Sequence, residues 1–401
     1  MSSIEELAKE CLNCKNPMCK KGCPVLTSIP EFIQAVKNEN MEEAYKILQS
    51  NNIMSEICSK ICPVEEQCVG HCVKGIRGKS VRINKLEELV NIWGRNNNIK
   101  IKLKKELENK EKVAIIGGGP AGIACAVELN KKGYDVTIFE KEEKIGGILE
   151  YQIPDFRLSK TYVKEIEEKV IKLGIKVKTN MEFGKILNFK KLEDENYKAV
   201  FLGIGAYVPN IFKLTDKNPQ GIYTADAILR KYYNKEKIDN LGKVIIIGGG
   251  NVAMDAARTL KKVRNEKVIV AYRRTEELMP AIKEEQEEAQ KEGVEFLYNT
   301  RVIKVILNNE NKITKLECVK TKIENSKVID IPKSKFEIDA DSVVFAIGLG
   351  IDNAFFNKLG INTENGLVKV DKYGMTNIKR NICRRRLNRS KTNCLQSNSK
   401  W

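Results

Sequence analysis

The sequence is almost without histidine, since His71 is the only one in 401 residues. Histidine is the commonest general acid–base near neutral pH, so few side chains here can do that work, and no nucleophile–base pair stands out. This scarcity favours hydride or electron transfer, in which bound cofactors carry the chemistry and the protein orients them. His71 lies between two cysteines, where it can ligate a metal or face solvent.

Long apolar runs are also missing. None approaches the ~20 residues that a membrane-spanning helix requires. The residues after Met1 show neither the basic lead nor the apolar core of a secretory signal. We therefore expect a cytoplasmic protein with no membrane partner. A reducing cytoplasm favours metal binding over a disulfide framework for the 12 cysteines.

Aromatic residues make up only 6% of the chain, although its net charge is +17. A nucleic-acid-binding face would interleave basic and aromatic side chains. Here lysine and glutamate are mixed along the body, and eight of the Lys and Arg residues lie in 379–400. We interpret the charge as a solvated surface with no nucleic-acid partner. Its mild positive field can attract an acidic partner or the phosphates of NADPH.

Eight of the cysteines lie in the first 72 residues, in two runs. The first run has the spacing Cys-x2-Cys-x4-Cys-x3-Cys and ends at Cys23, and the second has the spacing Cys-x3-Cys-x5-Cys-x3-Cys and ends at Cys72. Thiolates spaced in this way can converge on one small inorganic core, and a cysteine followed by proline is common where a ligand leads into a turn. Each run contains one such Cys-Pro pair.

Three interpretations of the cysteines compete. Iron–sulfur clusters accept these spacings and often take their last ligand from a distant run. Zinc knuckles prefer Cys-x2-Cys pairs, and only Cys11 and Cys14 have that spacing. Buried structural thiols are the third interpretation, which suits Cys125 and Cys318 in a predicted helix and a predicted strand.

The residues around the two cysteine runs predict an all-α domain over 1–95, because 30–36 and 41–48 have helical apolar spacing. Residues 96–112 are polar and highly charged, and we interpret them as a linker.

A different pattern begins with a buried strand over 113–116. It leads into a glycine-rich fingerprint, a predicted helix over 123–132 and a second strand over 134–140. The fingerprint reads Gly117-Gly-Gly119-Pro120-Ala121-Gly122. Together these elements form a complete βαβ unit, which predicts a dinucleotide site rather than a glycine-rich turn of an unrelated domain.

Each fingerprint position has a physical role. Gly117 permits the tight turn, Gly119 lets a pyrophosphate approach backbone N–H groups, and Gly122 lets the helix pack closely on the strand. Glu140 ends the second strand, where its carboxylate can accept hydrogen bonds from ribose hydroxyls.

The pattern repeats with a strand over 244–247, a helix that runs to Lys262 and a strand over 268–272. The second fingerprint reads Gly248-Gly-Gly250-Asn251-Val252-Ala253. Arg273 and Arg274 follow its second strand, where an acid would repel a 2′-phosphate and a guanidinium would pair with it. This favours NADPH at the second site, with surface charge as the alternative interpretation. A late strand over 342–348 is expected to return to the first dinucleotide domain.

Together these features resemble the small (beta) subunit of NADPH-dependent glutamate synthase and its relatives. The relatives include the large subunit of NADH-dependent ferredoxin:NADP oxidoreductase and the N-terminal half of dihydropyrimidine dehydrogenase. The resemblance covers residues from about 11 to 378. It rests on the stretches Cys-Lys-Asn-Pro (14–17), Gly-Cys-Pro-Val (22–25), Ile-Pro-Glu-Phe-Ile (29–33), Ile-Cys-Pro-Val-Glu-Glu-Gln-Cys (61–68), Gly-Gly-Ile-Leu (146–149), Ile-Pro-Asp-Phe-Arg-Leu (153–158) and Tyr-Gly-Met-Thr-Asn (373–377).

The resemblance implies two [4Fe–4S] clusters with ligands from both runs. One cluster would be held by Cys11, Cys14, Cys19 and Cys72. The other would be held by Cys23, Cys62, Cys68 and a carboxylate, Glu87, with Cys58 as a non-ligand.

The resemblance also implies FAD at the first fingerprint and NADPH at the second. FAD would contact Gly117, Gly119, Gly122 and Glu140, with Gly146 and Gly147 near the flavin. NADPH would contact Gly248, Gly250, Asn251, Arg273 and Arg274.

The implied fold class is α/β, with an N-terminal all-α iron–sulfur domain followed by two Rossmann-like domains for FAD and NADPH. Its expected segments are a helical domain with both clusters (1–95), a linker (96–112), the N-terminal segment of the FAD domain (113–206), an inserted NADPH domain (207–340), an incomplete C-terminal segment of the FAD domain (341–378) and a basic tail (379–401).

The chain departs from the family near its C-terminal end. The family continues with a segment such as Gly-Ile-Tyr-Ala-Gly-Gly-Asp, which holds the FAD phosphates and leads into a closing helix. Here 380–386 read Arg-Asn-Ile-Cys-Arg-Arg-Arg, as plausible codons for the family segment do when read in a shifted frame. We interpret residues from Arg380 onward as a frameshifted tail, with a genuine divergent basic tail as the alternative.

The resemblance implies an NADPH-oxidising flavoprotein that passes single electrons to a larger, electron-accepting partner subunit, most simply a glutamate synthase. Alternatives are the large subunit of an NADH-dependent ferredoxin:NADP oxidoreductase, a sulfide dehydrogenase, or a zinc-binding regulatory module on a nucleotide sensor. A further alternative is an inactive remnant that binds clusters or a partner without FAD.

Overall fold

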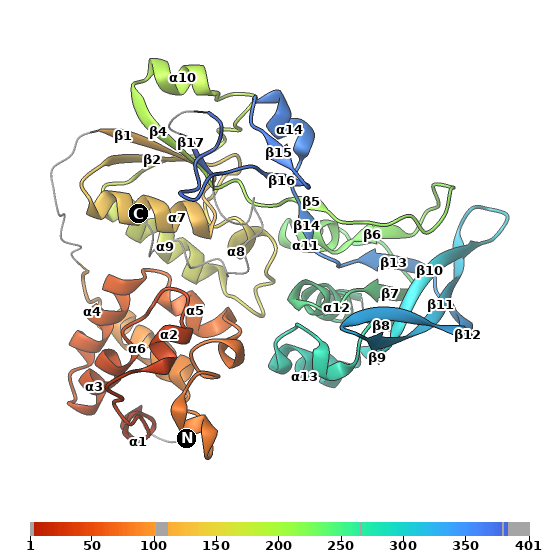
Figure 1. Ribbon diagram of the computed structural model, residues 1–401, viewed down its shortest axis with the longest axis horizontal. Helices are drawn as coiled ribbons and strands as arrows, with labels where there is room; N and C mark the ends of the chain where they lie inside the picture. Colours follow the sequence, from red (N-terminus) through yellow and green to blue (C-terminus); the bar gives the residue numbers. More distant parts are fainter. Residues whose placement is uncertain (1–3, 102–110, 265–266, 379–380, 384–401) are drawn as a thin grey trace. The chain divides into compact units, whose positions relative to one another are not determined.

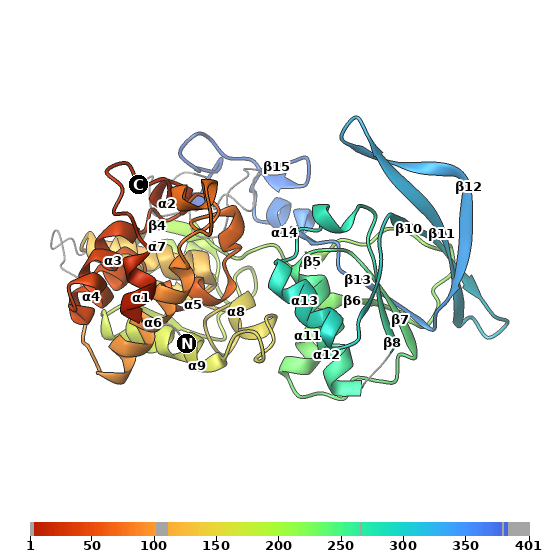
Figure 2. The ribbon, with the colours of Figure 1, turned by 90° about the horizontal axis from the view of Figure 1, so that it is seen from below.

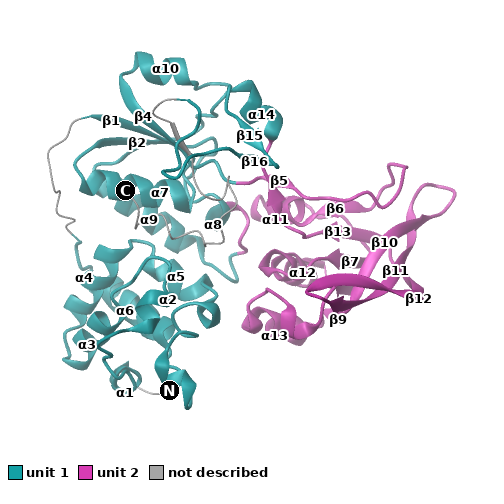
Figure 3. Cartoon of the chain, viewed as in Figure 1, with its two compact units in different colours: residues 1–150, 155–205, 353–401 teal, residues 151–154, 206–352 magenta. Residues whose placement is uncertain are grey.

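The computed structural model describes residues 4–101, 111–264, 267–378 and 381–383 (Figure 1). The chain divides into two compact units. The first comprises 1–150, 155–205 and 353–401, and the second comprises 151–154 and 206–352 (Figure 3). Each unit contains one five-stranded parallel sheet, and the first also contains the helical region that carries the cysteine runs.

Short helices separated by cysteine-bearing turns make up the N-terminal region, as the sequence predicts. The helices are α1 (Ile4–Lys9), α2 (Met18–Gly22), α3 (Ile29–Lys37), α4 (Met41–Asn51), α5 (Ser55–Ile61) and α6 (Ile83–Asn96), with 3-10 turns at Val64–Glu66 and Val73–Ile76. Asn40 caps α4, because its side chain accepts a hydrogen bond from the Glu43 N–H at 3.0 Å. Phe32, Leu48 and Leu86 are fully buried and form the centre of the apolar core.

The parallel sheet of the first unit has the strand order β17-β4-β1-β2-β3. Its strands are β1 (Lys112–Ile116), β2 (Asp135–Phe139), β3 (Lys176–Lys178), β4 (Tyr197–Leu202) and β17 (Asn381–Cys383). Its helices are α7 (Pro120–Lys131), α8 (Ile148–Tyr151), α9 (Lys160–Lys172) and α10 (Phe189–Asp194). The unit also contains α14 (Asn353–Lys358) and the small pair β15 (Thr363–Glu364) and β16 (Leu367–Val368).

Strand β17 lies within the segment that the sequence analysis interprets as a shifted tail. Asn381, Ile382 and Cys383 pair in parallel with Val200–Leu202 of β4. The sheet therefore includes residues beyond Ile378, because three residues of extended backbone are enough to pair with the open edge of β4. Residues 379–380 and 384–401 lie outside the described residues, so the shifted reading frame stays a prediction.

The parallel sheet of the second unit has the order β6-β13-β7-β8-β9. Its strands are β6 (Ile222–Thr224), β7 (Lys243–Ile247), β8 (Lys267–Ala271), β9 (Glu295–Leu297) and β13 (Ser342–Phe345), with helices α11 (Ala225–Tyr233), α12 (Asn251–Arg264) and α13 (Lys283–Lys291). Beside it lies an antiparallel sheet of β10 (Thr300–Leu307), β11 (Ile313–Glu324) and β12 (Lys327–Asp339), which is seen from two sides in Figures 1 and 2. A short ladder joins β5 (Val208–Pro209) to β14 (Leu349–Gly350).

The expectation that the strand over 342–348 returns to the first dinucleotide domain is wrong. Strand β13 pairs in parallel with β7 and β6 of the second unit. It follows β12 almost directly, and the Asp341 carboxylate accepts a hydrogen bond from the Lys243 N–H at 2.7 Å. The short connection and this contact seat the strand between β6 and β7, so the chain leaves the second unit only after Asp352.

Candidate cofactor sites

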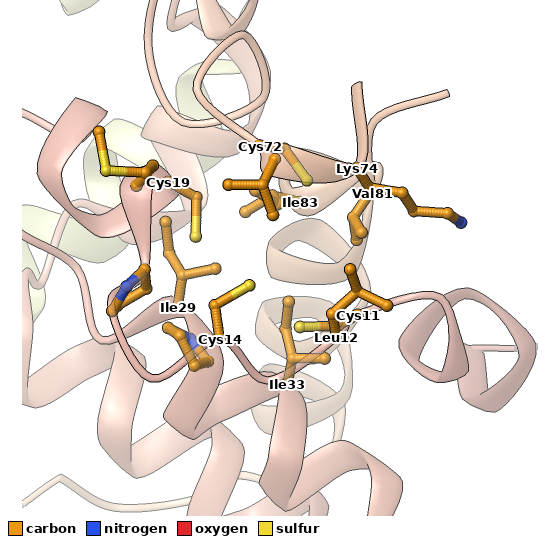
Figure 4. Close-up of a pocket in the computed structure, with 14 residues that line it drawn as sticks. Cys11, Leu12, Cys14, Cys19, Ile29, Ile33, Cys72, Lys74, Val81 and Ile83 are labelled. Carbon is orange, nitrogen blue, oxygen red and sulfur yellow. The ribbon is translucent and has the colours of Figure 1, made fainter. Parts of the chain in front are cut away.

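Four thiols from both cysteine runs line one pocket in the helical region. Cys11, Cys14 and Cys19 come from the first run and Cys72 from the second (Figure 4). Apolar side chains complete the pocket, among them Leu12, Ile29, Ile33, Val81 and Ile83. Burial raises the pKa of the Cys19 thiol to about 11, and the neighbouring thiols act in the same direction. A thiolate in this pocket therefore needs a cationic centre beside it.

Local backbone geometry brings the first-run thiols to this pocket. The Cys11 N–H donates to the Ala8 carbonyl at 3.0 Å, which ends the turn after α1. Asn13 then takes a left-handed conformation (φ 48°), which asparagine tolerates better than most residues. Cys19 lies on α2, whereas Cys72 immediately precedes the 3-10 turn at Val73.

A second group gathers Cys23, Cys62, Cys68 and Glu87. Burial raises the pKa of the Cys68 thiol, and the charges of Glu87, Cys23 and Cys62 act in the same direction. Glu87 is buried in α6, and this burial raises the pKa of its carboxyl to about 7. The hydrogen bond from Ser55 acts in the opposite direction, because it favours the ionised carboxylate. The predicted carboxylate thus lies with the three predicted thiols.

Cys58, expected to be a non-ligand, also lies in this second group. A hydrogen bond with Cys62 and then burial raise the pKa of its thiol. Its sulfur accepts a hydrogen bond from Asn52 Nδ2 at 3.2 Å. That bond gives Cys58 a polar partner inside the protein.

The donor chemistry of both groups fits iron–sulfur clusters. Among the residues that the structure describes, no three His, Cys, Asp or Glu side chains are placed to hold a single metal ion. In the first group the four thiols instead surround a space, and thiolates are the usual ligands of iron–sulfur clusters. In the second group the three predicted thiols and one buried carboxylate offer the mixed set that the resemblance implies, and the Cys58 thiol lies beside them.

The remaining metal-binding candidates are placed elsewhere. His71 is exposed, and its Nδ1 lies 2.7 Å from the Gln67 carbonyl oxygen. Cys125 and Cys318 are buried in α7 and β11, as expected for structural thiols.

The first glycine-rich loop lies between β1 and α7. Gly117 has a φ of +101°, and a Cβ there would lie 2.6 Å from the Gly203 carbonyl oxygen. A Cβ at Gly122 would collide with the carbonyl oxygen of Gly117. These two positions therefore require glycine for folding, whatever the loop binds.

Gly119 is different, because a Cβ there would meet nothing closer than the Gly147 Cα at 3.9 Å. Gly119 caps α7, which begins at Pro120, three residues earlier than we expected. Proline suits that first position because its missing N–H would have no partner within the helix. Ala121 is buried behind it. The open space beside Gly119, at a helix N-terminus, fits the phosphates of a dinucleotide.

Glu140 lies directly after β2 and is buried, which raises the pKa of its carboxyl. Its two oxygens accept hydrogen bonds from the Gly118 N–H at 2.7 Å and the Glu142 N–H at 3.0 Å. Gly146 joins the same loop by donating its N–H to the Gly118 carbonyl at 2.7 Å. Glu140 thus supports the loop, and its remaining lone pairs suit ribose hydroxyls.

The second glycine-rich loop lies between β7 and α12. A Cβ at Gly248 would collide with the Ala346 carbonyl oxygen, whereas a Cβ at Gly250 would meet nothing within 4 Å. Ala253 is fully buried, as a small residue packed on the strand must be, and Val252 is 40% exposed. The open position at Gly250 is again the one that a phosphate can approach.

Arg273 and Arg274 follow β8, at the edge where the second strand of a dinucleotide unit meets the ribose. Arg273 is exposed and Arg274 half-buried. Their backbones are held in place, because the Thr321 hydroxyl donates to the Arg273 carbonyl and the Asn299 N–H to the Arg274 carbonyl, both at 3.0 Å. In the described part of the chain, neither guanidinium forms an ion pair.

Sequence reasoning missed the segment around Ala281, which closes over the second loop. The Ala281 N–H donates to the Gly249 carbonyl at 3.0 Å, and the Ile282 N–H donates to Asn251 Oδ1 at 2.9 Å. Asn251 is therefore the first residue of α12 and also holds this segment through its side-chain oxygen. The Met-Pro-Ala sequence at 279–281 was the available signal, since proline and its neighbours mark a turn.

A partly buried ion-pair cluster around Arg258 supports the same segment. Arg258 on α12 donates to Glu285 at 2.6 Å and to Glu292 at 2.8 and 3.1 Å. Glu285 belongs to α13, and Glu292 follows that helix, which begins one residue after Ile282. The cluster therefore ties the position of the closing segment to α12.

Comparisons with known proteins agree with this arrangement. A family described as pyridine nucleotide-disulphide oxidoreductase matches residues 111–382, and one described as dihydropyrimidine dehydrogenase domain II, 4Fe-4S cluster, matches residues 1–99. The glutamate synthase [NADPH] small chain of Escherichia coli K12 is 31% identical over 85% of this chain and 76% of that protein. The chain belongs to the family of the glutamate synthase small chain.

Other relatives extend this result. The glutamate synthase [NADPH] small chain of Halomonas elongata is 32% identical over 92% of this chain and 81% of that protein. Among solved structures, Mycobacterium tuberculosis FprA in complex with NADPH has a TM-score of 0.59 at 16% identity, covering 69% of this chain and 78% of that chain. Thioredoxin reductase from T. acidophilum has a TM-score of 0.51 at 15% identity, covering 72% and 94%. These two likenesses show the fold.

The chain is therefore an NADPH-dependent iron–sulfur flavoprotein oxidoreductase with FAD, NADPH and 4Fe–4S as its cofactors, which confirms the resemblance and the fold class. Within the described residues, none of the helices has the length and apolar character needed to cross a membrane.

Proposed function

We propose that the chain is the NADPH-oxidising, electron-input subunit of a glutamate synthase. It works with a larger subunit that forms glutamate from glutamine and 2-oxoglutarate. The proposal is carried by one observation, the presence of two dinucleotide loops and two cysteine groups in a chain that covers 76% and 81% of two glutamate synthase small chains.

The two loops divide the nucleotide binding. FAD is held at the first loop by the open position Gly119, by Gly147 packed against it and by Glu140. NADPH is held at the second loop by Gly250, with Arg273 and Arg274 on its 2′-phosphate. Neither guanidinium is committed to an ion pair among the described residues, which supports this coenzyme choice. When bound, FAD supplies the change from a two-electron hydride donor to single electrons, and the clusters carry those electrons.

The two cysteine groups hold the two clusters in this proposal. The first is ligated by Cys11, Cys14, Cys19 and Cys72, which line one pocket. The second is ligated by Cys23, Cys62, Cys68 and Glu87. Apolar side chains around the first pocket lower the local dielectric at its half-buried thiols, which is one way a protein tunes a cluster.

A second candidate is a related oxidoreductase with another acceptor. A subunit of NAD-dependent dihydropyrimidine dehydrogenase from Escherichia coli O157:H7 is 32% identical over 72% of this chain and 70% of that protein. Arg273 and Arg274 favour the NADPH-dependent function over this NAD-dependent one, because an NADH site gains nothing from two cations at that position.

The test uses the full chain purified without oxygen, loaded with FAD and mixed with a glutamate synthase large chain. We expect NADPH-dependent formation of glutamate from glutamine and 2-oxoglutarate, and NADPH oxidation by the chain alone with ferricyanide. Reduction of ferricyanide without glutamate formation would move the function to another acceptor, such as ferredoxin or a sulfur compound. Clusters without FAD binding or NADPH oxidation would indicate an inactive remnant.

A further inference from the structure

Five polar side chains form a continuous hydrogen-bonded chain through the interior of the first unit. Lys169 Nζ on α9 lies 3.0 Å from Gln49 Oε1 on α4, and Gln49 Nε2 lies 2.8 Å from Asn91 Oδ1 on α6. Asn91 Nδ2 lies 2.9 Å from the Ser55 hydroxyl on α5, which lies 2.6 Å from Glu87 Oε1. Gln49, Asn91 and Ser55 are each 1% exposed. We call these five residues the donor chain.

The donor chain has one direction. A lysine ammonium can only donate and an ionised carboxylate can only accept, so the two ends fix the orientation of the two amides between them. Every bond therefore donates toward Glu87. Asn91 is held further, because its Nδ2 also donates to the Glu87 carbonyl at 2.8 Å. Hydrogen bonds aligned in this way polarise one another and stabilise negative charge at the accepting end.

The accepting end belongs to the second cysteine group. Of the two Glu87 oxygens, Oε1 is occupied by Ser55, and among the described residues no hydrogen bond engages Oε2. The charges of Glu87, Cys23 and Cys62 each raise the pKa of the Cys68 thiol, so all three groups lie close to Cys68. The donor chain therefore holds one Glu87 oxygen and leaves the other for the group that the three predicted thiol ligands hold. The Cys58 thiol beside them is bonded by Asn52.

The donating end belongs to the nucleotide-binding region of the same unit. Helix α9 packs beside the helical region, where Arg95 of α6 pairs with Glu56 at 2.8 Å and approaches Glu165 of α9 at 3.8 Å. Lys169 lies near both carboxylates, which offset its charge. A buried polar chain is costly unless each member is satisfied, so its completeness across four helices points to a role beyond packing.

We propose that Ser55, Asn91, Gln49 and Lys169 are positioning residues that orient Glu87 as the oxygen ligand of the second cluster and set its reduction potential. The inference rests on the proposed function, because it needs that cluster to be present. Removing donors from the chain leaves more negative charge on the ligand, so the cluster becomes harder to reduce.

The test is a redox titration of the anaerobically purified full chain, followed by electron paramagnetic resonance. Ser55→Ala is expected to lower the ratio of reduced to oxidised second cluster at a fixed potential by about tenfold, the effect of one hydrogen bond to a charged group. Asn91→Leu and Lys169→Met shift it in the same direction. Lys172→Met is the matched control, since it removes one lysine from the exposed side of α9.

Iron content and thermal unfolding separate the outcomes. A shifted signal with unchanged iron, or loss of about half the iron at an unchanged melting temperature, supports the inference. Unchanged signals in Ser55→Ala and Lys169→Met would overturn it, as would an equal shift in Lys172→Met. If Asn91→Leu fails to fold, Lys169→Met tests the chain from its half-exposed end. A wild-type chain without iron would instead overturn the proposed function, and this inference with it.

Discussion

Replacing Arg273 and Arg274 together by serine is expected to weaken NADPH binding strongly and NADH binding little. A charge-assisted hydrogen bond contributes about 1.5–3 kcal/mol when it is shielded from water, and a solvent-exposed ion pair about 0–1 kcal/mol. Arg274 is half-buried and Arg273 exposed. Their summed loss is therefore about 1.5–4 kcal/mol, or roughly 10- to 1,000-fold in the Kd of NADPH.

The structure makes this substitution a clean one. The Arg273 and Arg274 carbonyls keep their hydrogen bonds from Thr321 and Asn299, because the substitution removes only side-chain atoms. The Kd values of NADPH and NADH are measured by isothermal titration calorimetry on the full chain, and kcat/KM with ferricyanide as acceptor.

The matched control is the double variant Lys312→Ser and Lys315→Ser. It removes two positive charges from the same unit, and both lysines form exposed ion pairs. Lys315 lies six residues before Thr321 on β11, about 20 Å along the strand. An equal loss of affinity for both coenzymes, or the same NADPH loss in the control, would refute the assignment of the 2′-phosphate to these arginines.

Three further predictions concern the loops, the cysteines and the second unit. Gly122→Ala should lower both the melting temperature and the FAD content, because the new Cβ would collide with the Gly117 carbonyl oxygen. Gly119→Ala should fold normally and lose only affinity for FAD, because its Cβ meets no close atom. Equal melting temperatures of the two variants would contradict this prediction. The anaerobic chain should contain about eight irons, and Cys14→Ser about half; zinc without acid-labile sulfide would exclude clusters. Burial opposes ionisation of Glu292, but hydrogen bonds from Arg258 and a neighbouring lysine hold its pKa below the ordinary value. The stability that this carboxylate contributes is present above about pH 4.5 and is lost as the pH falls through the lowered pKa. Urea unfolding of Arg258→Met should show a weaker dependence on pH in this range, because only the lysine still pairs with Glu292.

Much of each nucleotide site could be predicted from local sequence. The fingerprints at Gly117 and Gly248 predicted strand, turn and helix because a tight turn and a close strand–helix contact need small residues at fixed spacings. Strands β1 and β7 begin within one residue of their predicted starts. The segment that closes on Asn251 could not be predicted in the same way, since its contact joins residues about thirty positions apart.

The sequence by itself determined the secondary structure around each glycine-rich loop and the presence of two cysteine runs, because spacings of a few residues decide local backbone geometry. Only the tertiary structure decided that β13 inserts between β6 and β7 and that Glu87 ends a chain of donors from α9. Such choices depend on which distant segments pack together. A short pattern does not specify its partner, because several strands or thiols of the same chain could satisfy it equally well until the core closes.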